Sequence, residues 1–405
     1  MKILVLAGGY DQIALMENLH KREHYVILVD YCENPPAKDY ADKHYRVSTL
    51  DMKIVLNIAI TEEIDLITTA CTDQALLTVA YVADKMGLPS YINFDTARNV
   101  TNKEYMKRKF SEYKIPTAIA HVIKKLEDIE KYDCKFPLIV KPVDCNSSKG
   151  VRKVTNEKEL SATIKNALKL SRSHAAIMEP FITGKEISID AWNDKNGTKI
   201  LSISETSKIK NSTGFTIYQS KYPVELSADA EKQIVKIAAD ICNAFNLKNC
   251  PILIQAIVNN NNVYVIEFSA RMGGGSKYKL IEYMSGIQIM DIYVNRILGD
   301  TNQIVNPSRS SKKIELNYVY GSTGIFHSLV NFKELHKANI IKELFIYKTK
   351  GSKIWDYTTS SDRILGFLIA ENDEQRLIEQ REKILQTTDI LDSAGRSMML
   401  KDYFE

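Results

Sequence analysis

Apolar and polar residues alternate along the first ninety positions in a pattern typical of an α/β unit. The pattern predicts apolar strands at 3–6, 26–29 and 65–70, with helices after the first strand and at 74–86. The first strand ends at Gly8-Gly9 and the second ends at Asp30. Strands that alternate with helices favour a doubly wound parallel sheet, so we predict a Rossmann-like domain over residues 1–95.

From about residue 95 the pattern becomes mixed. It predicts two short helices within 93–116, strands at 136–140, 186–190, 200–203, 252–258 and 263–268, and helices at 228–245 and 279–298. Asn196-Gly197 and the Asn-rich stretch 259–262 are turn signals, so the strands beside each are expected to pair as hairpins. We therefore predict a second, α+β unit over residues 96–305.

The last hundred residues are predicted to form a third, α+β unit over 306–405. Its strands fall at 314–320, 345–348 and 364–369, and a helix rich in charge falls at 372–386. That charge is most simply explained as a solvated helix face. No catalytic arrangement of residues is evident in this unit. Three units suit a chain of 405 residues, because this length exceeds what one hydrophobic core usually serves.

The stretch VYVIEFSARMGGG at 263–275 places charge in apolar surroundings. Its β-branched and aromatic residues predict a strand that is covered on both faces. A period of two puts Glu267, Ser269 and Arg271 on one face of the extended chain. Charged groups are costly there unless they are paired, and the glycines at 273–275 let the backbone approach a bound group closely. A ligand or metal site and a buried Glu–Arg salt bridge beside a glycine turn both fit this stretch.

A second polar feature follows the strand at 136–140. Lys141 stands at the end of that strand, and the small polar loop DCNSSKG follows at 144–150. Backbone N–H groups and hydroxyls of such a loop donate to phosphate oxygens, and ammonium groups neutralise phosphate charge. A surface loop with an incidental lysine is the alternative, since the Walker spacing GxxxxGK[ST] is absent.

Composition narrows the function classes. The 54 basic and 50 acidic residues give a net charge of +4, which is nearly neutral at this size, so nucleic acid is not an expected partner. No apolar run reaches the length of a membrane span, so no membrane association is expected. The six cysteines contain no CxxC pair, which favours reduced thiols and a cytoplasmic protein.

Two weaker signals lie near the N-terminus. Gly8 and Gly9 leave the dinucleotide fingerprint GxGxxG incomplete, so a dehydrogenase is disfavoured. His20 and His24 have an i,i+4 spacing that zinc can use, but no Glu adjoins His20 and no third ligand is evident. A solvated helix face is the favoured interpretation of the two histidines.

Taken in order, these stretches resemble the ATP-grasp superfamily, specifically its carboxylate–amine ligase branch, over nearly the whole chain. The family pattern has one phosphate-contacting lysine after an Asp or Asn, as in Asn102-Lys103, and another at the end of a strand, as Lys141 in FPLIVKP. Its loop over the triphosphate is similar to 144–150, which implies phosphate contacts from Ser147, Ser148 and Lys149. The resemblance implies a pre-ATP-grasp domain, a two-lobed ATP-grasp fold with a mobile lid at about 112–185, and a C-terminal subdomain.

The resemblance also implies where the nucleoside binds. The family's hinge, an acidic residue, a short apolar linker and Gly-x-Glu, matches Glu179, Phe181, Ile182, Gly184 and Glu186. By that resemblance Glu179 accepts from the adenine amino group, and the backbone of Phe181 and Ile182 reads the ring edge. Glu186 is implied to bind the ribose hydroxyls.

The metal stretch matches the family at Glu267 and Arg271 and departs from it at two positions. Gln255 and Ser269 stand where relatives commonly have an acidic residue and an Asn. The implied cofactors are ATP and Mg²⁺ or Mn²⁺, with Glu267, Gln255 and Ser269 as ligands. Mg²⁺ prefers few carboxylates together with phosphates and water, so one carboxylate with a neutral Gln suffices for one ion.

The resemblance implies an ATP-dependent ligase. A substrate carboxylate attacks the γ-phosphoryl group to give an acyl phosphate and ADP, and an amine or related nucleophile then displaces phosphate. Arg271, Lys141 and Glu267 are the implied catalytic residues, since the site must offset repulsion between anions and a guanidinium meets such oxygens in a planar fork. Phosphoribosylamine–glycine ligase is one alternative. A non-catalytic ATP-binding protein is another, which Gln255 and Ser269 keep open.

The expected partners are a small-molecule carboxylate and an amine, and a homodimer is among the expected assemblies. Biotin carboxylation is disfavoured, because no lysine lies in a Met-Lys-Met carrier setting. The acceptor pocket is expected at loops after the N-terminal strands, with Asp30, Thr72 and Asp73 as candidates.

Overall fold

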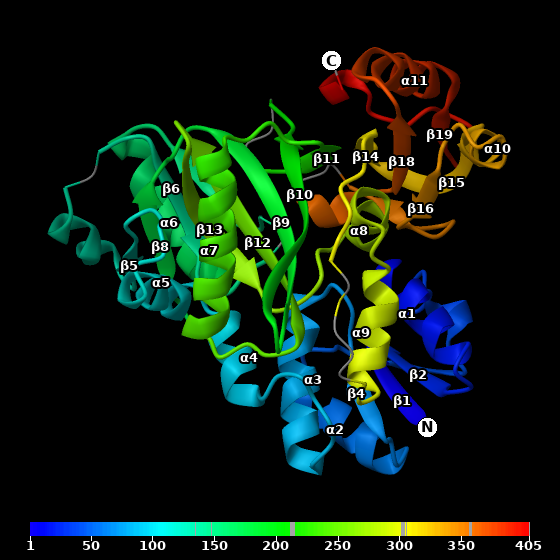
Figure 1. Ribbon diagram of the computed structural model, residues 1–405, viewed down its shortest axis with the longest axis horizontal. Coiled ribbons are helices and arrows are strands. Elements are labelled where there is room, and N and C mark those ends of the chain that lie inside the picture. Colours follow the sequence, from blue (N-terminus) through cyan, green and yellow to red (C-terminus); the bar gives the residue numbers. More distant parts are fainter. Residues whose placement is uncertain are drawn as a thin grey trace.

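The computed structural model describes residues 1–133, 135–146, 148–210, 215–300, 304, 306–355 and 359–404 (Figure 1). The chain begins with a four-stranded sheet of β1 (Lys2–Leu6), β2 (Tyr25–Asp30), β3 (Lys43–Arg46) and β4 (Leu66–Thr68). Its order is β3-β2-β1-β4, and all neighbouring pairs are parallel. The predicted α/β opening is therefore confirmed.

Helices cover both faces of this sheet because successive side chains of each strand point to opposite faces. Ile3 and Val5 pack toward α1 (Asp11–His20), whereas Leu4 and Leu6 pack toward α2 (Met52–Thr61) and α3 (Asp73–Met86). A short 3-10 turn, η1 (Lys38–Tyr40), follows β2. The carboxyl ends of β1, β2 and β4 thus meet at one edge, where an open sheet of this type carries its loops.

A smaller antiparallel sheet lies at the far side of the molecule from the N-terminus (Figure 1). It contains β5 (His121–Ile123), β6 (Leu138–Pro142), β7 (Arg152–Val154) and β8 (Ala176–Pro180), in the order β5-β8-β6-β7. Helix α6 (Glu157–Leu170) and the turn η2 (Leu126–Lys131) pack against it. The two short helices predicted within 93–116 are α4 (Phe94–Val100) and α5 (Lys103–Glu112), which lead into this sheet.

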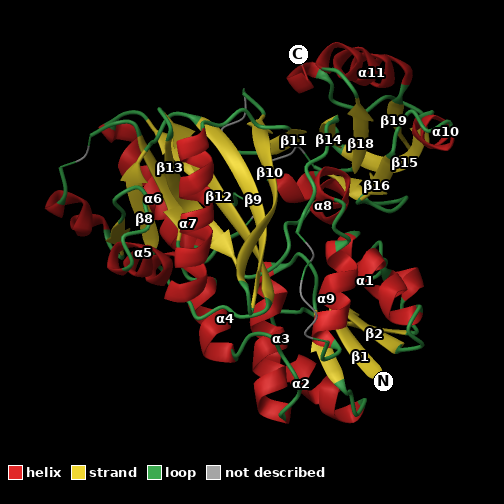
Figure 2. Cartoon of the chain, viewed as in Figure 1, coloured by secondary structure: helices red, strands yellow, loops and turns green. Residues whose placement is uncertain are grey.

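The largest sheet has eight strands in the order β13-β12-β9-β10-β11-β14-β18-β16. Its members are β9 (Lys185–Asp194), β10 (Gly197–Lys208), β11 (Ile217–Tyr222), β12 (Cys250–Asn259), β13 (Asn262–Ser269), β14 (Lys313–Val319), β16 (Glu343–Ile346) and β18 (Leu365–Glu371). Both predicted hairpins, β9–β10 and β12–β13, are present. Helix α7 (Ala228–Ala244) crosses one face of the sheet, as Figure 2 shows, and buries Ile234, Ile237 and Ile241 against it.

The single helix predicted at 279–298 is wrong, because the chain forms two helices there. Helix α8 (Lys277–Ser285) ends at Gly286, whose φ of +72° is left-handed, and α9 (Ile289–Ile297) starts three residues later. A left-handed glycine commonly terminates a helix because it carries no Cβ. The break lets α8 pack against β14 while α9 packs against α1.

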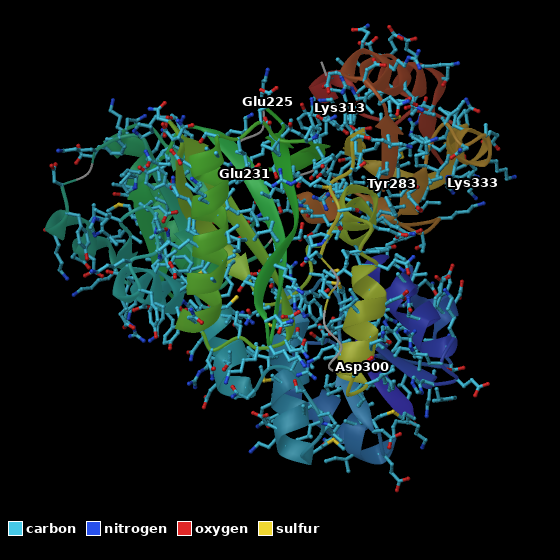
Figure 3. The ribbon with its side chains drawn as sticks, in the orientation of Figure 1. Glu225, Glu231, Tyr283, Asp300, Lys313 and Lys333 are labelled. Atoms are coloured by element: carbon cyan, nitrogen blue, oxygen red, sulfur yellow. The ribbon has the colours of Figure 1, made fainter. Side chains whose placement is uncertain are left out.

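The end of the chain adds a three-stranded sheet, β17-β15-β19, beside β16 and β18. Its elements are β15 (Gly324–Val330), β17 (Lys353–Ile354), β19 (Asp389–Asp392), α10 (Phe332–Lys337), α11 (Glu374–Thr387), η3 (Ser360–Asp362) and η4 (Asp402–Phe404). The charged helix α11 buries Leu377, Ile384 and Leu385 and leaves its polar side outward. Exposed charged side chains such as Glu225 and Lys333 project from the outer surface (Figure 3). No helix in the described ranges is both long and apolar enough to cross a bilayer.

Candidate active site

Helix α5 presents two lysines to the space between the small and large sheets. Asn102 caps this helix by accepting a hydrogen bond from the Tyr105 N–H at 3.1 Å, which fixes where the first turn begins. Lys103 and Lys107 are then i,i+4 neighbours on one helix face, and both are buried. Lys103 Nζ lies 3.2 Å from Glu267 and donates to the Cys145 carbonyl at 2.7 Å.

Glu179 on β8 bridges two other buried lysines. Its carboxylate lies 2.5 Å from Lys141 Nζ and 2.7 Å from Lys107 Nζ. Ile177 pairs directly with Lys141 across β6 and β8, so Glu179 is the diagonal neighbour of Lys141 on the same side of the sheet. Lys107 also donates to Thr117 Oγ1 at 2.6 Å. The sequence prediction included Lys141 and Glu179 but missed Lys107, although its i,i+4 spacing from Lys103 was available.

Burial and charge oppose each other in this lysine–glutamate cluster (Lys103, Lys107, Lys141, Glu179 and Glu267). Burial favours the neutral form of Glu179, but the charges of Lys141 and Lys107 outweigh it and lower the pKa of the carboxyl. Burial lowers the pKa of Lys107 to about 8, although Glu179 acts against that shift. The cluster therefore holds its three lysines and Glu179 away from water, each with an internal partner, and leaves Glu267 partly exposed.

The predicted metal residues lie together on one face of the large sheet. Gln255 on β12 pairs directly with Glu267 on β13, and Ser188 on β9 pairs with Gln255, so the three form one row across the strands. Ser269 faces the same way one row further along, opposite Leu253. The Oγ of Ser188 is buried and has no partner within the described residues. Oxygen donors from Glu267, Gln255 and Ser269 fit a hard cation such as Mg²⁺, with room left for phosphate oxygens and water.

The expectation that 263–268 is covered on both faces needs correction. β13 is the edge strand of the large sheet, with Val263, Val265 and Phe268 in the core and Tyr264 and Ile266 only half-buried. A register shift between Gln255 and Ala256 leaves Ile266 without a direct partner on β12. This bulge keeps Phe268 in the core, so Glu267 faces the cavity described below.

Arg271 follows the edge strand and is nearly enclosed. Its guanidinium pairs with Asp73 at the start of α3 and donates to the Met272 carbonyl at 2.6 Å. Burial disfavours the charged form, but the Asp73 carboxylate outweighs it and raises the pKa of Arg271. The Glu–Arg salt bridge weighed for this stretch does not form, since Glu267 pairs with Lys103 and Arg271 with Asp73.

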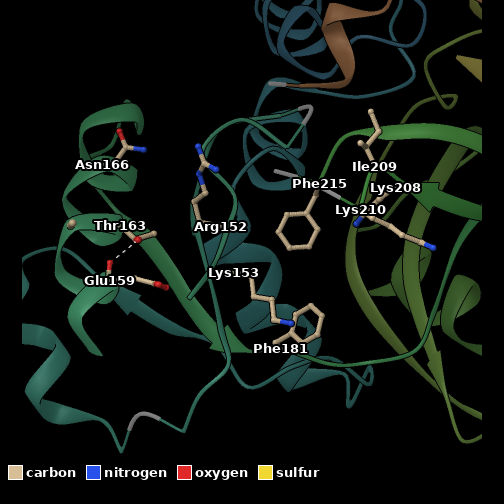
Figure 4. Close-up of a pocket in the computed structure, with 11 residues that line it drawn as sticks. Arg152, Lys153, Glu159, Thr163, Asn166, Phe181, Lys208, Ile209, Lys210 and Phe215 are labelled. Carbon is tan, nitrogen blue, oxygen red and sulfur yellow. Dashed lines mark hydrogen bonds between the residues drawn. The ribbon is translucent and has the colours of Figure 1, made fainter. Parts of the chain in front are cut away.

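Phe181, within the hinge at 179–186, borders a cleft of about 700 Å³ between the small and large sheets (Figure 4). The ring of Phe181 lies 4.0 Å below Lys153 Nζ, and Phe215 lines the same cleft. The Phe181 N–H donates to the Pro137 carbonyl at 3.0 Å, whereas the Ile182 N–H has no acceptor within the described part of the chain. Of the two predicted backbone donors, only Ile182 is therefore available to a ligand.

Two details fix the end of this hinge. Glu186 pairs with Lys208, which also lines the cleft. Gly184 has a φ of +146°, and a Cβ at that position would lie 2.4 Å from the Val258 carbonyl oxygen. Only glycine lets β9 leave the hinge so close to β12.

The polar loop at 144–150 closes the site on a third side. Ser148 Oγ donates to the Phe215 carbonyl at 3.3 Å, and Ser148 and Lys149 both line the cavity described next. Asp144 accepts from the N–H of Ser173 at 3.0 Å, which ties the start of the loop to the end of α6. Ser147, the other predicted phosphate residue, lies outside the described residues.

A cavity of about 860 Å³ lies where the N-terminal sheet, the large sheet and the C-terminal strands meet. Glu267, Gln255, Ser269 and Arg271 line it, so the predicted metal and catalytic residues share one space. Lys103, Lys141 and Glu179 are not part of its lining and lie behind Glu267 toward the small sheet. We call this space the junction cavity.

The N-terminal candidates differ in their position relative to the junction cavity. Thr72 and Asp73 line it, but Asp30 accepts hydrogen bonds from the N–H groups of Gly8 and Cys32, each at 2.7 Å. Asp30 thus orders the loop after β1. His20 pairs with Asp42 at 3.0 Å, and no cluster of three metal-binding His, Cys, Asp or Glu residues occurs within the described ranges.

Comparison with known proteins agrees with this architecture. Residues 134–279 match the family described as ATP-grasp domain. A D-alanine–D-alanine ligase from Flavobacterium johnsoniae is 27% identical over 228 residues, which are 52% of this chain and 68% of that protein. An L-amino acid ligase from Bacillus licheniformis has a TM-score of 0.79 at 19% identity, covering 97% of this chain and 98% of the other. A phosphoribosylglycinamide synthetase from Anaerococcus prevotii has a TM-score of 0.74 at 20% identity, covering 97% and 99%.

The chain therefore contains an ATP-grasp domain, and the resemblance seen in its sequence is confirmed. It is related to ATP-grasp ligases, whose family typically binds ATP together with Mg²⁺. The identities to the solved structures are low, so those likenesses concern the fold alone.

Proposed function

We propose that this protein is an ATP-dependent ligase that joins a carboxylate to an amine through an acyl phosphate, releasing ADP and phosphate. The observation that carries this proposal is the contact of Lys103 with Glu267 at 3.2 Å, at the wall of the junction cavity. That contact places a cation suited to phosphate beside a carboxylate suited to a metal ion. The same cavity is large enough for a second small molecule beside a triphosphate.

The nucleoside is proposed to enter between the small and large sheets. Phe181 offers an aromatic face, and the free N–H of Ile182 offers a donor to the edge of the base. Glu179 is proposed to accept from the adenine amino group and Glu186 from the ribose hydroxyls. Glu179 is paired with Lys107, and Glu186 is paired with Lys208. The nucleotide is therefore proposed to bind carboxylates that keep their lysine partners.

The phosphates are proposed to run from the cleft toward Glu267. Lys103 and Lys141 supply positive charge from the small-sheet side, and Ser147, Ser148 and Lys149 donate from the loop. A divalent cation held by Glu267, Gln255 and Ser269 would offset phosphate charge and align the γ-phosphoryl group. The attack on the γ-phosphoryl group is proposed to come from the junction cavity, a proposal supported by Glu267, Gln255 and Arg271, which all line it.

Arg271 is proposed to steady the reacting carboxylate or the phosphoryl group in transit. Its Nε is buried and has no partner among the described residues, while its other two nitrogens are held by Asp73 and Met272. The guanidinium is therefore fixed in orientation before substrate arrives. Such pre-oriented charge is the main way in which phosphoryl transfer between anions is accelerated.

An isotope experiment tests the proposed reaction. Candidate acids and amino acids would be screened for ADP release with Mg²⁺ and ATP, and the best acid would then be labelled with ¹⁸O in its carboxylate. The acyl-phosphate route transfers one ¹⁸O atom to the released phosphate. Label found only in the product, or ATP cleaved to AMP and pyrophosphate, would contradict it. ATP binding without ADP release for any acid would favour a non-catalytic ATP-binding protein.

A further inference from the structure

Lys107 is a buried lysine that has no part in the proposed path of the phosphates. It is 8% exposed, and it is not among the residues that line the cleft or the junction cavity. Its Nζ contacts Glu179 Oε2 at 2.7 Å and donates to Thr117 Oγ1 at 2.6 Å. A charged side chain at this depth is costly unless partners hold it. Lys107 therefore contacts protein groups, and any effect that it has on a ligand passes through them.

The two contacts lie at the entry and the exit of the small sheet. The chain enters this sheet after Thr117 and leaves it after β8, whose last residue but one is Glu179. Thr117 is itself bound to the edge strand β13 of the large sheet, because its Oγ1 donates to the Val265 carbonyl at 2.6 Å. The Val265 N–H donates to the Pro116 carbonyl at 2.8 Å, which completes a short parallel bridge. Lys107 thus joins the exit of the small sheet to an entry point that is fixed on the large sheet.

Helix α5 holds Lys107 on the side of the large sheet. Phe110 of this helix packs against Phe268 of β13, with ring centres 6.1 Å apart, in a core that α5 shares with the large sheet. Lys141, which also pairs with Glu179, lies beside it on β6 of the small sheet. The contact with Lys141 is therefore internal to the small sheet, whereas the contact with Lys107 fixes Glu179 relative to the large sheet.

Glu179 lies on the cleft side of the small sheet. It pairs directly with Ile139, and the N–H of Phe181 donates to the Pro137 carbonyl at 3.0 Å, so the ladder between β6 and β8 continues to Phe181. Glu179 and Phe181 are therefore on one face of the extended chain, and Phe181 lines the cleft. Glu179 Oε2 has no donor aligned for a hydrogen bond among the described residues, so a lone pair of this buried oxygen is open to a ligand.

The charge of Glu179 decides which base it can accept. An ionised carboxylate accepts hydrogen bonds and cannot donate them. Burial favours the neutral form of Glu179, but the charges of Lys141 and Lys107 outweigh it and lower the pKa of the carboxyl. The exocyclic amino group of adenine donates, whereas the carbonyl oxygen at the same position of hypoxanthine only accepts. A carboxylate that is held charged and in place favours the first base and opposes the second.

We propose that Lys107 is a specificity-determining positioning residue: it fixes Glu179 relative to the large sheet, so that the cleft selects a base with an exocyclic amino group over one with a carbonyl oxygen. This inference rests on the proposed function, because it takes the nucleoside to bind in this cleft, and it adds the residue that sets base selection. Lys107 acts through Glu179 and Thr117 and does not touch the nucleotide. Binding of the triphosphate, which other residues contact, is independent of it.

Equilibrium binding without turnover tests this role. Calorimetry would measure affinities, in the presence of Mg²⁺, for the β,γ-imido analogue of ATP, for the matching inosine analogue and for tripolyphosphate. The wild type is expected to bind the adenosine analogue at least about tenfold more tightly than the inosine analogue, because hypoxanthine places an acceptor against a buried acceptor. Lys107→Met should bring this ratio close to one, while its affinity for tripolyphosphate stays within about twofold of the wild-type value.

Two results would overturn the proposal directly. One is a folded Lys107→Met protein that keeps the wild-type ratio, or a wild type that shows no preference between the two bases. The other is a loss of tripolyphosphate affinity as large as the loss for the ATP analogue, since a general structural defect weakens both.

A double-mutant cycle tests whether Lys107 acts through Glu179. Lys107→Met alone should weaken binding of the adenosine analogue roughly tenfold, because a charged acceptor loses its fixed position. In a Glu179→Gln background the same change should weaken it by no more than about twofold, since the group through which Lys107 acts has been replaced. A full tenfold loss in that background would show that Lys107 acts by another route, and it would overturn the proposal.

Two further variants guard against a folding artefact. Thr117→Val removes one hydroxyl and leaves the ion pair between Lys107 and Glu179, so it should lower the base preference about threefold in the same direction. If Lys107→Met does not fold, an unchanged preference in Thr117→Val overturns the proposal. Lys109→Met, on the same helix and paired with Glu112 at 2.7 Å, is the matched control and should bind all three ligands like the wild type.

The binding and turnover readouts separate this role from the proposed function. If the wild type prefers adenine and releases ADP with an acid, but Lys107→Met keeps that preference, the role of Lys107 is wrong and the ligase assignment stands. If the wild type binds the analogue but no acid gives ADP, the proposed reaction fails, and the base preference of Lys107→Met still decides the role of Lys107.

Discussion

The lysine–glutamate cluster and the pair of Lys277 and Arg363, which line the junction cavity, are both cationic, but they balance charge in different ways. In the cluster, each lysine lies within 3.2 Å of a carboxylate: Glu179 pairs with Lys107 and Lys141, and Glu267 pairs with Lys103. In the pair, neither cation forms an ion pair with a carboxylate among the described residues. The first region pairs its lysines with carboxylates at contact distance, whereas in the second the main opposing charge on Lys277 is Asp190, which forms no ion pair with it within the described residues.

This difference indicates two modes of ligand recognition. A buried cation that already has a carboxylate partner gains little further charge compensation from an incoming anion. The carboxylate instead holds the cationic side chain in a fixed position. An unpaired buried cation gains more from the ligand, because its desolvation has not been offset.

The largest effect on turnover is expected from Lys141→Ala, which removes one of the two lysines paired with Glu179. Glu179 would keep only Lys107, and the phosphates would lose a buried ammonium group. Turnover should fall by at least about a hundredfold, in the range for loss of one oriented transition-state donor. Calorimetry measures the affinity for ATP, and steady-state kinetics measure turnover. Lys236→Ala on α7, an exposed lysine paired with Asp240, is the control. Unchanged ATP affinity in a folded Lys141→Ala protein would contradict the assignment.

Glu179→Gln tests whether the cluster depends on internal pairing. The change leaves Lys107 and Lys141 adjacent and buried without their shared carboxylate, so the free energy of unfolding should drop by about 3 kcal/mol. Denaturant titration measures it, with Glu225→Gln at an exposed site for comparison. If Glu179→Gln lowered the free energy of unfolding no more than Glu225→Gln does, Lys107 and Lys141 would have to reach solvent in the variant.

Glu267→Gln tests the link between the cluster and the proposed metal. Activity should fall roughly a hundredfold and lose most of its Mg²⁺ dependence, because the one carboxylate of the ligand set is removed. Gln255→Glu, in the position directly across the strands, should be tolerated and should lower the Mg²⁺ concentration needed for half-maximal rate. If Glu267→Gln kept the wild-type Mg²⁺ titration, the metal would have to lie elsewhere.

Arg271→Lys sharpens the comparison, since Arg271 is paired with Asp73 yet lines the same cavity as Lys277. A lysine keeps the charge but cannot hold Asp73, the Met272 carbonyl and a substrate oxygen together. The KM for the acid should rise about tenfold while ATP affinity stays constant. If ATP affinity fell by the same factor as KM rose, Arg271 would contact the nucleotide rather than the acid.

The smallest effect concerns pH. The folded pKa of Lys107, about 8, lies below its ordinary value of 10.5, so the unfolded chain binds more protons between these values. The contribution of Lys107 to the unfolding free energy should therefore rise with pH across this window and stay at its minimum below it. Lys107→Met should remove that rise, whereas Lys114→Met, at an exposed position beyond α5, should keep it. Identical pH profiles for the two variants would exclude a depressed pKa at Lys107.

Local patterns predicted much of this fold. The parallel opening, both hairpins and helix α7 follow from apolar periodicity and turn residues, because those signals act over a few neighbours. The helix at 279–298 was predicted as one element, since its apolar pattern runs on through Gly286. The break depends on the backbone conformation of that single glycine and on two different packing partners, which sequence periodicity does not report.

The sequence by itself supplied the candidate residues for the proposed chemistry, because Lys141 and Glu267 stand in strands of recognisable pattern and Glu179 was identified by the family resemblance. Only the tertiary structure decided their partners. Lys107 reaches Glu179 and Arg271 reaches Asp73 across 72 and 198 positions of the chain, respectively, and no local pattern reports such pairings. The lack of an ion pair at Lys277 and Arg363 among the described residues is likewise a property of the folded cavity, since burial and distance to the nearest carboxylates exist only once the three parts of the chain have come together.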